Sequence, residues 1–154
     1  MISDRLVFKT GWSCNHKERS ELLDLMNSIK EVTLTNETFD MFDVLYYIKP
    51  DQEKIFLVAM VDEKMIGYVY GTLESAGYAC LYYLAVRQEA RRNGIGKLLV
   101  QEFLKEVEKK WDVKYVYTLS TNQNMTNFIK WIGFYEGEKV TYLKFNLVKS
   151  KIVK

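Results

Sequence analysis

The stretch that decides the fold spans residues 80–111 and reads CLYYLAV (80–86), RQEARRNGIG (87–96) and KLLVQEFLKEVEKKW (97–111). Its first part is uncharged and rich in aromatic and aliphatic residues, which predicts a buried strand. Its last part repeats apolar residues at spacings of three and four, which predicts an amphipathic helix. A basic loop with glycines at 94 and 96 joins them. These residues therefore predict a strand, a loop and a central helix.

The loop at 91–96, Arg-Arg-Asn-Gly-Ile-Gly, combines glycine, positive charge and a helix N-terminus. Glycine lets backbone N–H groups approach a ligand closely and adopt conformations that a Cβ would forbid. Unpaired amides and the helix dipole at the start of a helix favour an anion, and the two arginines add full charges. We therefore predict a cradle for phosphate or pyrophosphate.

Other interpretations of this loop fit the residues less well. A dinucleotide-binding fingerprint needs a third glycine, and position 99 is Leu. A kinase-type P-loop needs the GK[ST] motif, which the sequence lacks. An ordinary strand-to-helix turn also contains glycines, but the paired arginines favour an anion site.

The loop resembles that of the GNAT superfamily of acyl-CoA-dependent N-acyltransferases. The family signature is Gln or Arg, two residues, Gly, one residue, then Gly or Ala, and Arg91, Gly94 and Gly96 match it. The residues before the loop are similar to the end of the family's fourth strand. Further on, Asn122, a short predicted helix and Gly133-Phe134 follow at the family's usual separation. The C-terminal half carries the resemblance by motif, and the N-terminal half by element order.

The resemblance implies a role for each matching residue. Backbone amides from Arg92 to Lys97 hold the pyrophosphate of acetyl-CoA, the co-substrate, while Arg91 fixes the loop. The end of the fourth strand holds the pantetheine arm, where the family's fourth and fifth strands splay apart; a fully paired strand fits these side chains equally well. The implied cofactor-binding residues are Leu84, Ala85, Val86, Arg91, Arg92, Asn93, Gly94, Ile95, Gly96, Lys97 and Asn122. Asn122 fits a helix N-cap as well as a cofactor contact.

The position of the family's general acid departs from the pattern. Family members usually carry a Tyr four residues before the Gly-Phe pair, placed to protonate the departing thiolate, and here that position is Ile129. A thiol with a pKa near ~8.5 is able to depart as a thiolate, so the change slows the reaction without forbidding it. Tyr142 and Tyr135 are the alternative proton donors, although a structural aromatic role fits each of them too.

An attacking ammonium must lose a proton, so a base is expected near the acceptor amine. Glu74, at the end of the predicted third strand, is our candidate base, and Tyr82 is the candidate link in a water chain. Period-two alternation predicts that Tyr82 and Cys80 share a face with Leu84. We expect Cys80 to be a buried hydrophobe rather than a nucleophile, and His16 to be a solvent-exposed helix residue.

The bulk composition bounds the class of protein. The chain has 154 residues, 48% of them hydrophobic and 14% aromatic, which predicts one folded domain over 1–154 with a frayed tail at 149–154. A net charge of +2 argues against a nucleic-acid partner. The sequence has no membrane-spanning run or signal-peptide pattern, and two cysteines are too few for a disulfide framework or a metal knuckle. We therefore expect a cytoplasmic protein without a metal.

Periodicity and turn residues predict the remaining elements. The predicted strands lie at 5–10, 55–61, 65–73, 80–86, 115–121 and 140–148, and the predicted helices at 16–30, 36–48, 95–111 and 125–132. Ser13 or Asn15 is expected to cap the first helix, and Pro50 follows the end of the second. The order β-α-α-β-β-β-α-β-α-β predicts an α/β fold with a mixed sheet and helices on its faces, in agreement with the resemblance.

Three functions are compatible with these residues, and the third of them is a general nucleotide- or phosphate-binding protein. The first is an N-acetyltransferase that moves an acetyl group from acetyl-CoA to a primary amine, on a small molecule or a protein, by direct attack. Carboxylates beside aromatics in residues 31–49 suit a cationic acceptor. The second is a binding module that keeps the CoA site but has lost efficient catalysis, because position 129 is not Tyr. A homodimer is left open.

Overall fold

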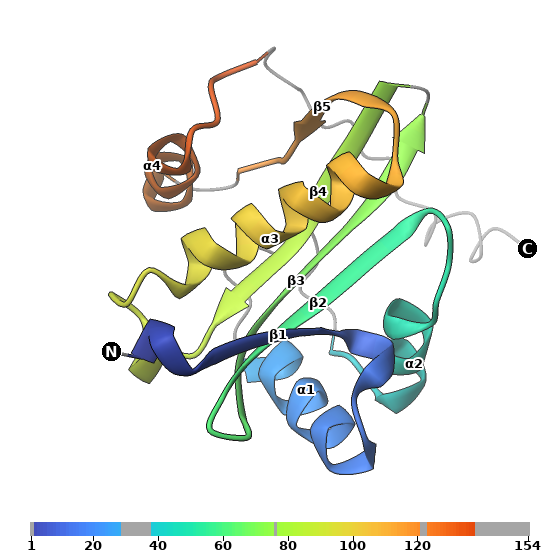
Figure 1. Ribbon diagram of the computed structural model, residues 1–154, viewed down its shortest axis with the longest axis vertical. Helices are drawn as coiled ribbons and strands as arrows, with labels where there is room; N and C mark the ends of the chain where they lie inside the picture. Colours follow the sequence, from blue (N-terminus) through green and yellow to red (C-terminus); the bar gives the residue numbers. More distant parts are fainter. Residues whose placement is uncertain (1, 29–37, 76, 121–122, 138–154) are drawn as a thin grey trace, which may run out of the picture.

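A mixed five-stranded sheet in the order β1-β2-β3-β4-β5 is the centre of the computed structural model, which describes residues 2–28, 38–75, 77–120 and 123–137 (Figure 1). The strands are β1 (Leu6–Thr10), β2 (Lys54–Val61), β3 (Lys64–Ser75), β4 (Gly77–Val86) and β5 (Val113–Tyr117). The pairs β1–β2, β2–β3 and β3–β4 are antiparallel, and the pair β4–β5 is parallel. The predicted mixed α/β sheet is confirmed.

Four α-helices flank this sheet within the described residues. They are α1 (His16–Ser28), α2 (Met41–Ile48), α3 (Ile95–Lys110) and α4 (Gln123–Ile132). Short 3-10 turns occupy Ile2–Arg5, Gly11–Ser13 and Gln88–Ala90. Helix α3 crosses one face of the sheet, α1 and α2 cover the opposite face, and α4 lies beside the start of α3 (Figure 1).

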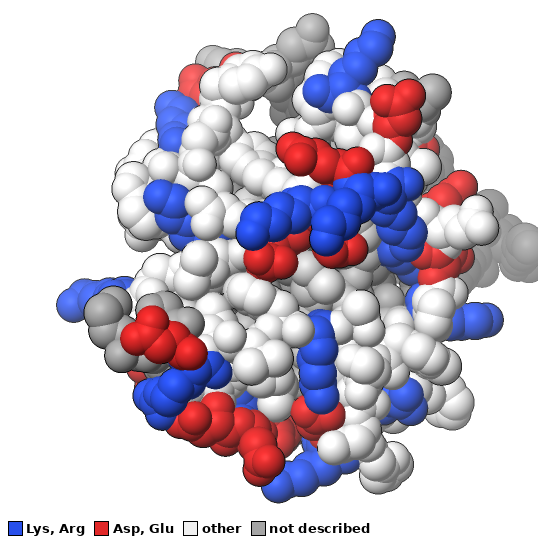
Figure 2. All heavy atoms as spheres, viewed as in Figure 1, with Lys and Arg blue, Asp and Glu red and all other residues white. Residues whose placement is uncertain are grey.

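Two apolar cores separate these layers. The core under α3 joins Leu99, Val100 and Phe103 of the helix to alternate residues of β2, β3 and β4. Its outer surface is charged, with ion pairs between Lys105 and Glu102 (3.1 Å) and between Lys109 and Glu106 (3.6 Å). Figure 2 shows a band of basic and acidic side chains across this face. The amphipathic helix predicted from residues 95–111 therefore buries its apolar side and exposes its charged side, as its spacing requires.

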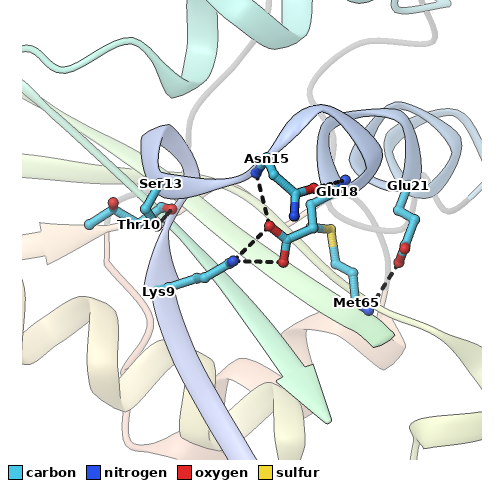
Figure 3. Close-up of polar contacts among 7 residues, drawn as sticks. All are labelled: Lys9, Thr10, Ser13, Asn15, Glu18, Glu21 and Met65. Atoms are coloured by element: carbon cyan, nitrogen blue, oxygen red, sulfur yellow. Dashed lines mark hydrogen bonds and ion pairs between the residues drawn. The ribbon is translucent and has the colours of Figure 1, made fainter. Parts of the chain in front are cut away.

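Helix α1 is attached to the sheet by polar contacts at its first turn (Figure 3). The Asn15 side chain accepts a hydrogen bond from the Glu18 amide (2.9 Å), and the Glu18 carboxylate accepts one from the Asn15 amide (2.9 Å). Buried Glu18 also pairs with Lys9 of β1 (2.6 Å). Asn15 is therefore the cap of α1, while the Ser13 hydroxyl donates to the Thr10 carbonyl instead (2.8 Å).

Several predicted boundaries are wrong by a few residues. Helix α2 begins at Met41 rather than near 36, because Asp40 and Asp43 form a capping box that starts it there. Strand β5 ends at Tyr117 rather than at 121. The predicted last strand at 140–148 lies outside the described residues, together with Asn122 and Tyr142.

A β-bulge in β4 changes which face each side chain occupies. Tyr70 pairs with Tyr83 and the next residue, Gly71, pairs with Leu81, so Tyr82 is an extra residue in β4. Leu81 and Leu84 both belong to the core under α3, whereas Tyr82 and Tyr83 pack on the α1/α2 side. The prediction that Tyr82 and Cys80 share a face with Leu84 is therefore wrong, because one inserted residue reverses the alternation.

Candidate functional site

A cavity of about 650 Å³ lies between the end of β4, the start of α3 and helix α4. Figure 2 shows the surface hollowed on its left side, at the level between α4 and the beginning of α3. The cavity is lined by Leu84, Ala85, Val86, Arg91, Arg92, Gly94, Ile95, Gly96, Lys97, Asn124, Met125, Phe128 and Trp131. Most of the residues predicted to bind a cofactor are thus brought to one place.

The cavity opens along β4 because its pairing with β5 ends early. The parallel ladder runs from Gly77, opposite Val113, to Cys80, opposite Tyr117, and described β5 residues form no ladder with 81–86. The Thr118 hydroxyl donates to the Leu81 carbonyl (2.9 Å), and beyond that point the strand edge faces the cavity. An exposed strand edge offers backbone donors and acceptors to an extended ligand.

The loop before α3 is built by backbone conformation and by internal hydrogen bonds. Gly94 is the N-cap of α3 with φ of +74°, a left-handed conformation that favours glycine, and Arg92 also has a positive φ of +66°. The Arg91 Nε donates to the Val86 carbonyl (3.1 Å), which ties the loop to β4. Asn93 does not line the cavity; its side-chain amide donates to the carbonyls of Ala90 (3.2 Å) and Arg91 (3.1 Å). Asn93 therefore supports the loop from within.

The start of α3 carries amides that suit an anion. An α-helix leaves its first N–H groups without intrahelical partners, and a side chain at the N-cap usually accepts from them. Gly94 has no side chain, so α3 has no side-chain cap. A Cβ built on Gly94 would find no atom within 4 Å, so the approach to these amides is open. Arg92 and Lys97 add positive charge at the same end of the cavity.

Helix α4 forms the far wall of the cavity, a contribution that was not predicted from the sequence. Gly96 faces the Phe128 ring so closely that a Cβ there would lie 2.9 Å from Cζ. Asn124, Met125, Phe128 and Trp131 line the cavity from this helix. Their spacing of three to four residues marks one helical face, and that signal was present in the sequence. What it lacked was any indication that the face points toward α3.

The sequence matches a known family over most of its length. The profile described as "Acetyltransferase (GNAT) family" matches residues 20–134. This match includes every residue that lines the cavity. The chain belongs to the GNAT acetyltransferase family. Its enzyme class is that of the acyl-CoA-dependent N-acetyltransferases. No match was found among curated proteins.

Solved structures share the GNAT fold over nearly the whole chain. An aminoglycoside acetyltransferase from an uncultured soil metagenomic sample, solved with sisomicin, has a TM-score of 0.74 at 19% identity, over 96% of this chain and 99% of that one. An aminoglycoside N-acetyltransferase in complex with CoA has a TM-score of 0.73 at 15% identity, over 91% and 94%. A ribosomal-protein-alanine N-acetyltransferase from Brucella melitensis biovar Abortus 2308 has a TM-score of 0.66 at 16% identity, over 91% and 98%. At these identities the likeness shows the fold alone.

The candidate base and its neighbour are in contact in this GNAT domain. The Tyr82 hydroxyl donates a hydrogen bond to the Glu74 carboxylate, and the Thr72 hydroxyl donates to the same oxygen (3.2 Å). The hydrogen bond to Glu74 and partial burial raise the pKa of Tyr82, so Tyr82 is a neutral donor at neutral pH. Burial raises the pKa of Cys80 to about 12, so this thiol stays protonated.

The Glu74–Tyr82 pair does not line the cavity. Tyr82 precedes Leu84 by two residues, a separation of about 7 Å along a strand. Tyr82 instead borders a group of aromatic rings on the α1/α2 side, with centroids 6.3 Å from both Tyr70 and Tyr83. Tyr47 of α2 joins this group, its hydroxyl 3.4 Å from that of Tyr83. An aromatic surface with one carboxylate thus lies on the α1/α2 side of the sheet, opposite the core that contains Leu84.

Three further predicted positions have defined surroundings. Ile129, at the position of the family's Tyr, is buried with 6% of its surface exposed. Tyr135 is 84% exposed and does not line the cavity, so the structure does not bring this candidate acid to the site. His16 is exposed at the start of α1, as expected. Among the described residues, no group of three or more His, Cys, Asp or Glu is placed to hold a metal ion, and no helix is long and apolar enough to span a membrane.

Proposed function

We propose that this protein transfers an acetyl group from acetyl-CoA to a primary amine by direct attack of the amine on the thioester. One observation carries the proposal: a single cavity joins residues 84–86 of β4, with which the described part of β5 forms no ladder, to the amides at the start of α3. A long ligand with a diphosphate at one end and an amide-containing arm at the other matches both parts. Acetyl-CoA has this form, and when bound it would supply the activated acetyl group as its thioester.

Each part of the cavity has its own task in this proposal. The amides at the start of α3, with the charge of Arg92, hold the diphosphate, because helix dipole and charge both favour an anion there. Arg91 and Asn93 keep the loop in shape through their hydrogen bonds to backbone carbonyls. Backbone groups of residues 84–86 orient the arm.

The acceptor amine must arrive as an ammonium ion and lose a proton before it attacks. We assign Glu74 the role of base and Tyr82 that of the group that holds it in place, since the Tyr82 hydroxyl donates to the carboxylate. Because this pair does not line the cavity, the proton passes from the ammonium to Glu74 through water. Ile129 cannot donate a proton, so the departing sulfur leaves as a thiolate stabilised by amides or water.

The acceptor class in this proposal is a primary amine, on a small molecule or a protein. A similar aminoglycoside acetyltransferase solved with sisomicin supports a small-molecule amine, and a similar ribosomal-protein-alanine N-acetyltransferase supports a protein amine. The second candidate function is a CoA-binding module with little turnover, which the buried Ile129 favours.

The experiment is a thiol-release assay with acetyl-CoA and a panel of amines, run beside calorimetry with acetyl-CoA, ATP and NAD. We expect acetyl-CoA to bind, ATP and NAD to bind weakly, and at least one amine to release thiol. Binding of acetyl-CoA without turnover on any amine would identify the binding module. Absence of acetyl-CoA binding would overturn both functions.

A further inference from the structure

Trp131 has surroundings that the acetyl-transfer reaction does not explain. Its side chain lines the cavity, yet it is 62% exposed, so its indole forms part of the open mouth rather than of the floor. The neighbouring ring, Phe128, lies 6.3 Å away on the same helix and is only partly buried. A large flat apolar surface held at a cavity mouth is costly to leave in water, and such surfaces commonly bind ligands.

A cation lies beside this indole. The Lys97 ammonium is 4.4 Å from the centroid of the Trp131 ring, a cation–π distance. Lys97 is in the first turn of α3, whose amides are open toward the cavity. Arg92, exposed in the preceding loop, lines the same cavity. The mouth thus combines an aromatic platform with two positive charges, next to amides suited to a diphosphate.

We propose that Trp131 and Lys97 form the subsite for the nucleotide end of CoA, with the adenine stacked on Trp131 and the 3′-phosphate bound by Lys97. The inference rests on the proposed use of CoA. A base has an apolar face that stacks on an indole regardless of its hydrogen-bonding edge, and a phosphate next to it pairs with a cation.

Another tryptophan in the chain serves as a matched control. Trp12 is 47% exposed and also carries a cation over its ring, with the Arg19 guanidinium 5.2 Å from the centroid. It does not line the cavity. Trp12→Ala therefore removes a similar side chain and a similar cation–π contact without touching the proposed subsite.

The experiment measures the affinity of the full chain for three probes: CoA, dephospho-CoA, which lacks the 3′-phosphate, and 4′-phosphopantetheine, which lacks the whole nucleotide. Stacking on an aromatic side chain is worth about 1–3 kcal/mol per base, so Trp131→Ala should weaken CoA and dephospho-CoA about 5- to 150-fold. It should leave 4′-phosphopantetheine unchanged, and Trp131→Tyr should restore most of the loss. Lys97→Met should weaken CoA more than dephospho-CoA, because only CoA carries the phosphate it binds.

Each outcome separates this inference from the proposed function. If wild type binds none of the three probes, the use of CoA is wrong. If wild type binds CoA and Trp131→Ala binds it equally well, the adenine subsite is wrong while the CoA site stands. Equal weakening of CoA and 4′-phosphopantetheine by Trp131→Ala would also overturn the subsite, because it would place the indole against the shared part of the ligand. Weakening by Trp12→Ala to the same extent would show a general loss of structure and count against it too.

Discussion

Helix α3 packs closely on β3 at Gly71, where the strand has no side chain. A Cβ added there would lie 2.3 Å from Cζ of Phe103 and 2.4 Å from the carbonyl oxygen of Cys80. Phe103 is fully buried in the core under α3, and the Cys80 carbonyl belongs to the neighbouring strand. Neither neighbour is able to yield without moving a helix or a strand. We therefore predict that Gly71→Ala is strongly destabilising.

The size of the effect follows from these two contacts. Overpacking a buried site costs about 1–3 kcal/mol when side chains are able to adjust. Here one of the clashes is with backbone, so we expect the upper end, a loss of about 3 kcal/mol in the free energy of unfolding. For a chain of this length, that corresponds to a fall in Tm of roughly 6–12 °C.

Thermal and urea unfolding followed by circular dichroism measure this loss. Gly137→Ala is the control, because a Cβ on Gly137 would find no atom within 4 Å, and its Tm should stay close to that of wild type. A Gly71→Ala protein that melts within about 2 °C of wild type, less than about 1 kcal/mol of destabilisation, would refute this close packing of α3 on β3.

Three further predictions concern α1 and the site. Glu18→Gln removes the ion pair with Lys9 and should cost about 1.5–3 kcal/mol of stability at pH 7 in urea unfolding. Burial opposes ionisation of Glu18, but hydrogen bonds from Lys9 and a backbone amide outweigh it and hold the pKa of Glu18 below the ordinary 4.5. The stability difference between wild type and Glu18→Gln should therefore persist above pH 4.5 and shrink as pH falls through the lower pKa of the folded state. A stability difference that stays constant down to acid pH would contradict this assignment. Gly96→Ala places a methyl against the ring that forms the far wall, so calorimetry should show acetyl-CoA weakened at least about fivefold with little change in Tm; unaltered affinity would place the ligand elsewhere. Glu74→Gln should lower kcat about 10²-fold in the thiol-release assay, with a smaller loss in Tyr82→Phe; wild-type activity in both variants would remove this pair from the mechanism.

Local sequence was sufficient for the order of the elements from β1 to α4 and for the position of the loop at 91–96. Its glycines and arginines act through their own backbone and charge, so the place of the loop at a helix N-terminus was predicted without knowledge of the rest of the fold, while its role toward a phosphate stays a prediction. The apolar spacing of α3 was equally legible, because one face of a helix is decided by residues three and four apart. The Asn93 side chain has a role that its sequence position did not indicate, since its hydrogen bonds turn inward to Ala90 and Arg91 and support the loop.

The bulge at Tyr82 was beyond the reach of sequence periodicity. The stretch CLYYLAV is apolar throughout, because β4 is buried on both faces, and such a strand carries no alternation from which to assign sides. The site itself also needed tertiary contacts. Only the end of the β4–β5 ladder at Cys80 opens the strand edge, and only the packing of α4 against Gly96 brings Trp131 opposite Lys97. The sequence determined which local pieces this protein has, whereas their arrangement around the cavity depended on contacts between residues far apart in the chain, which no local pattern encodes.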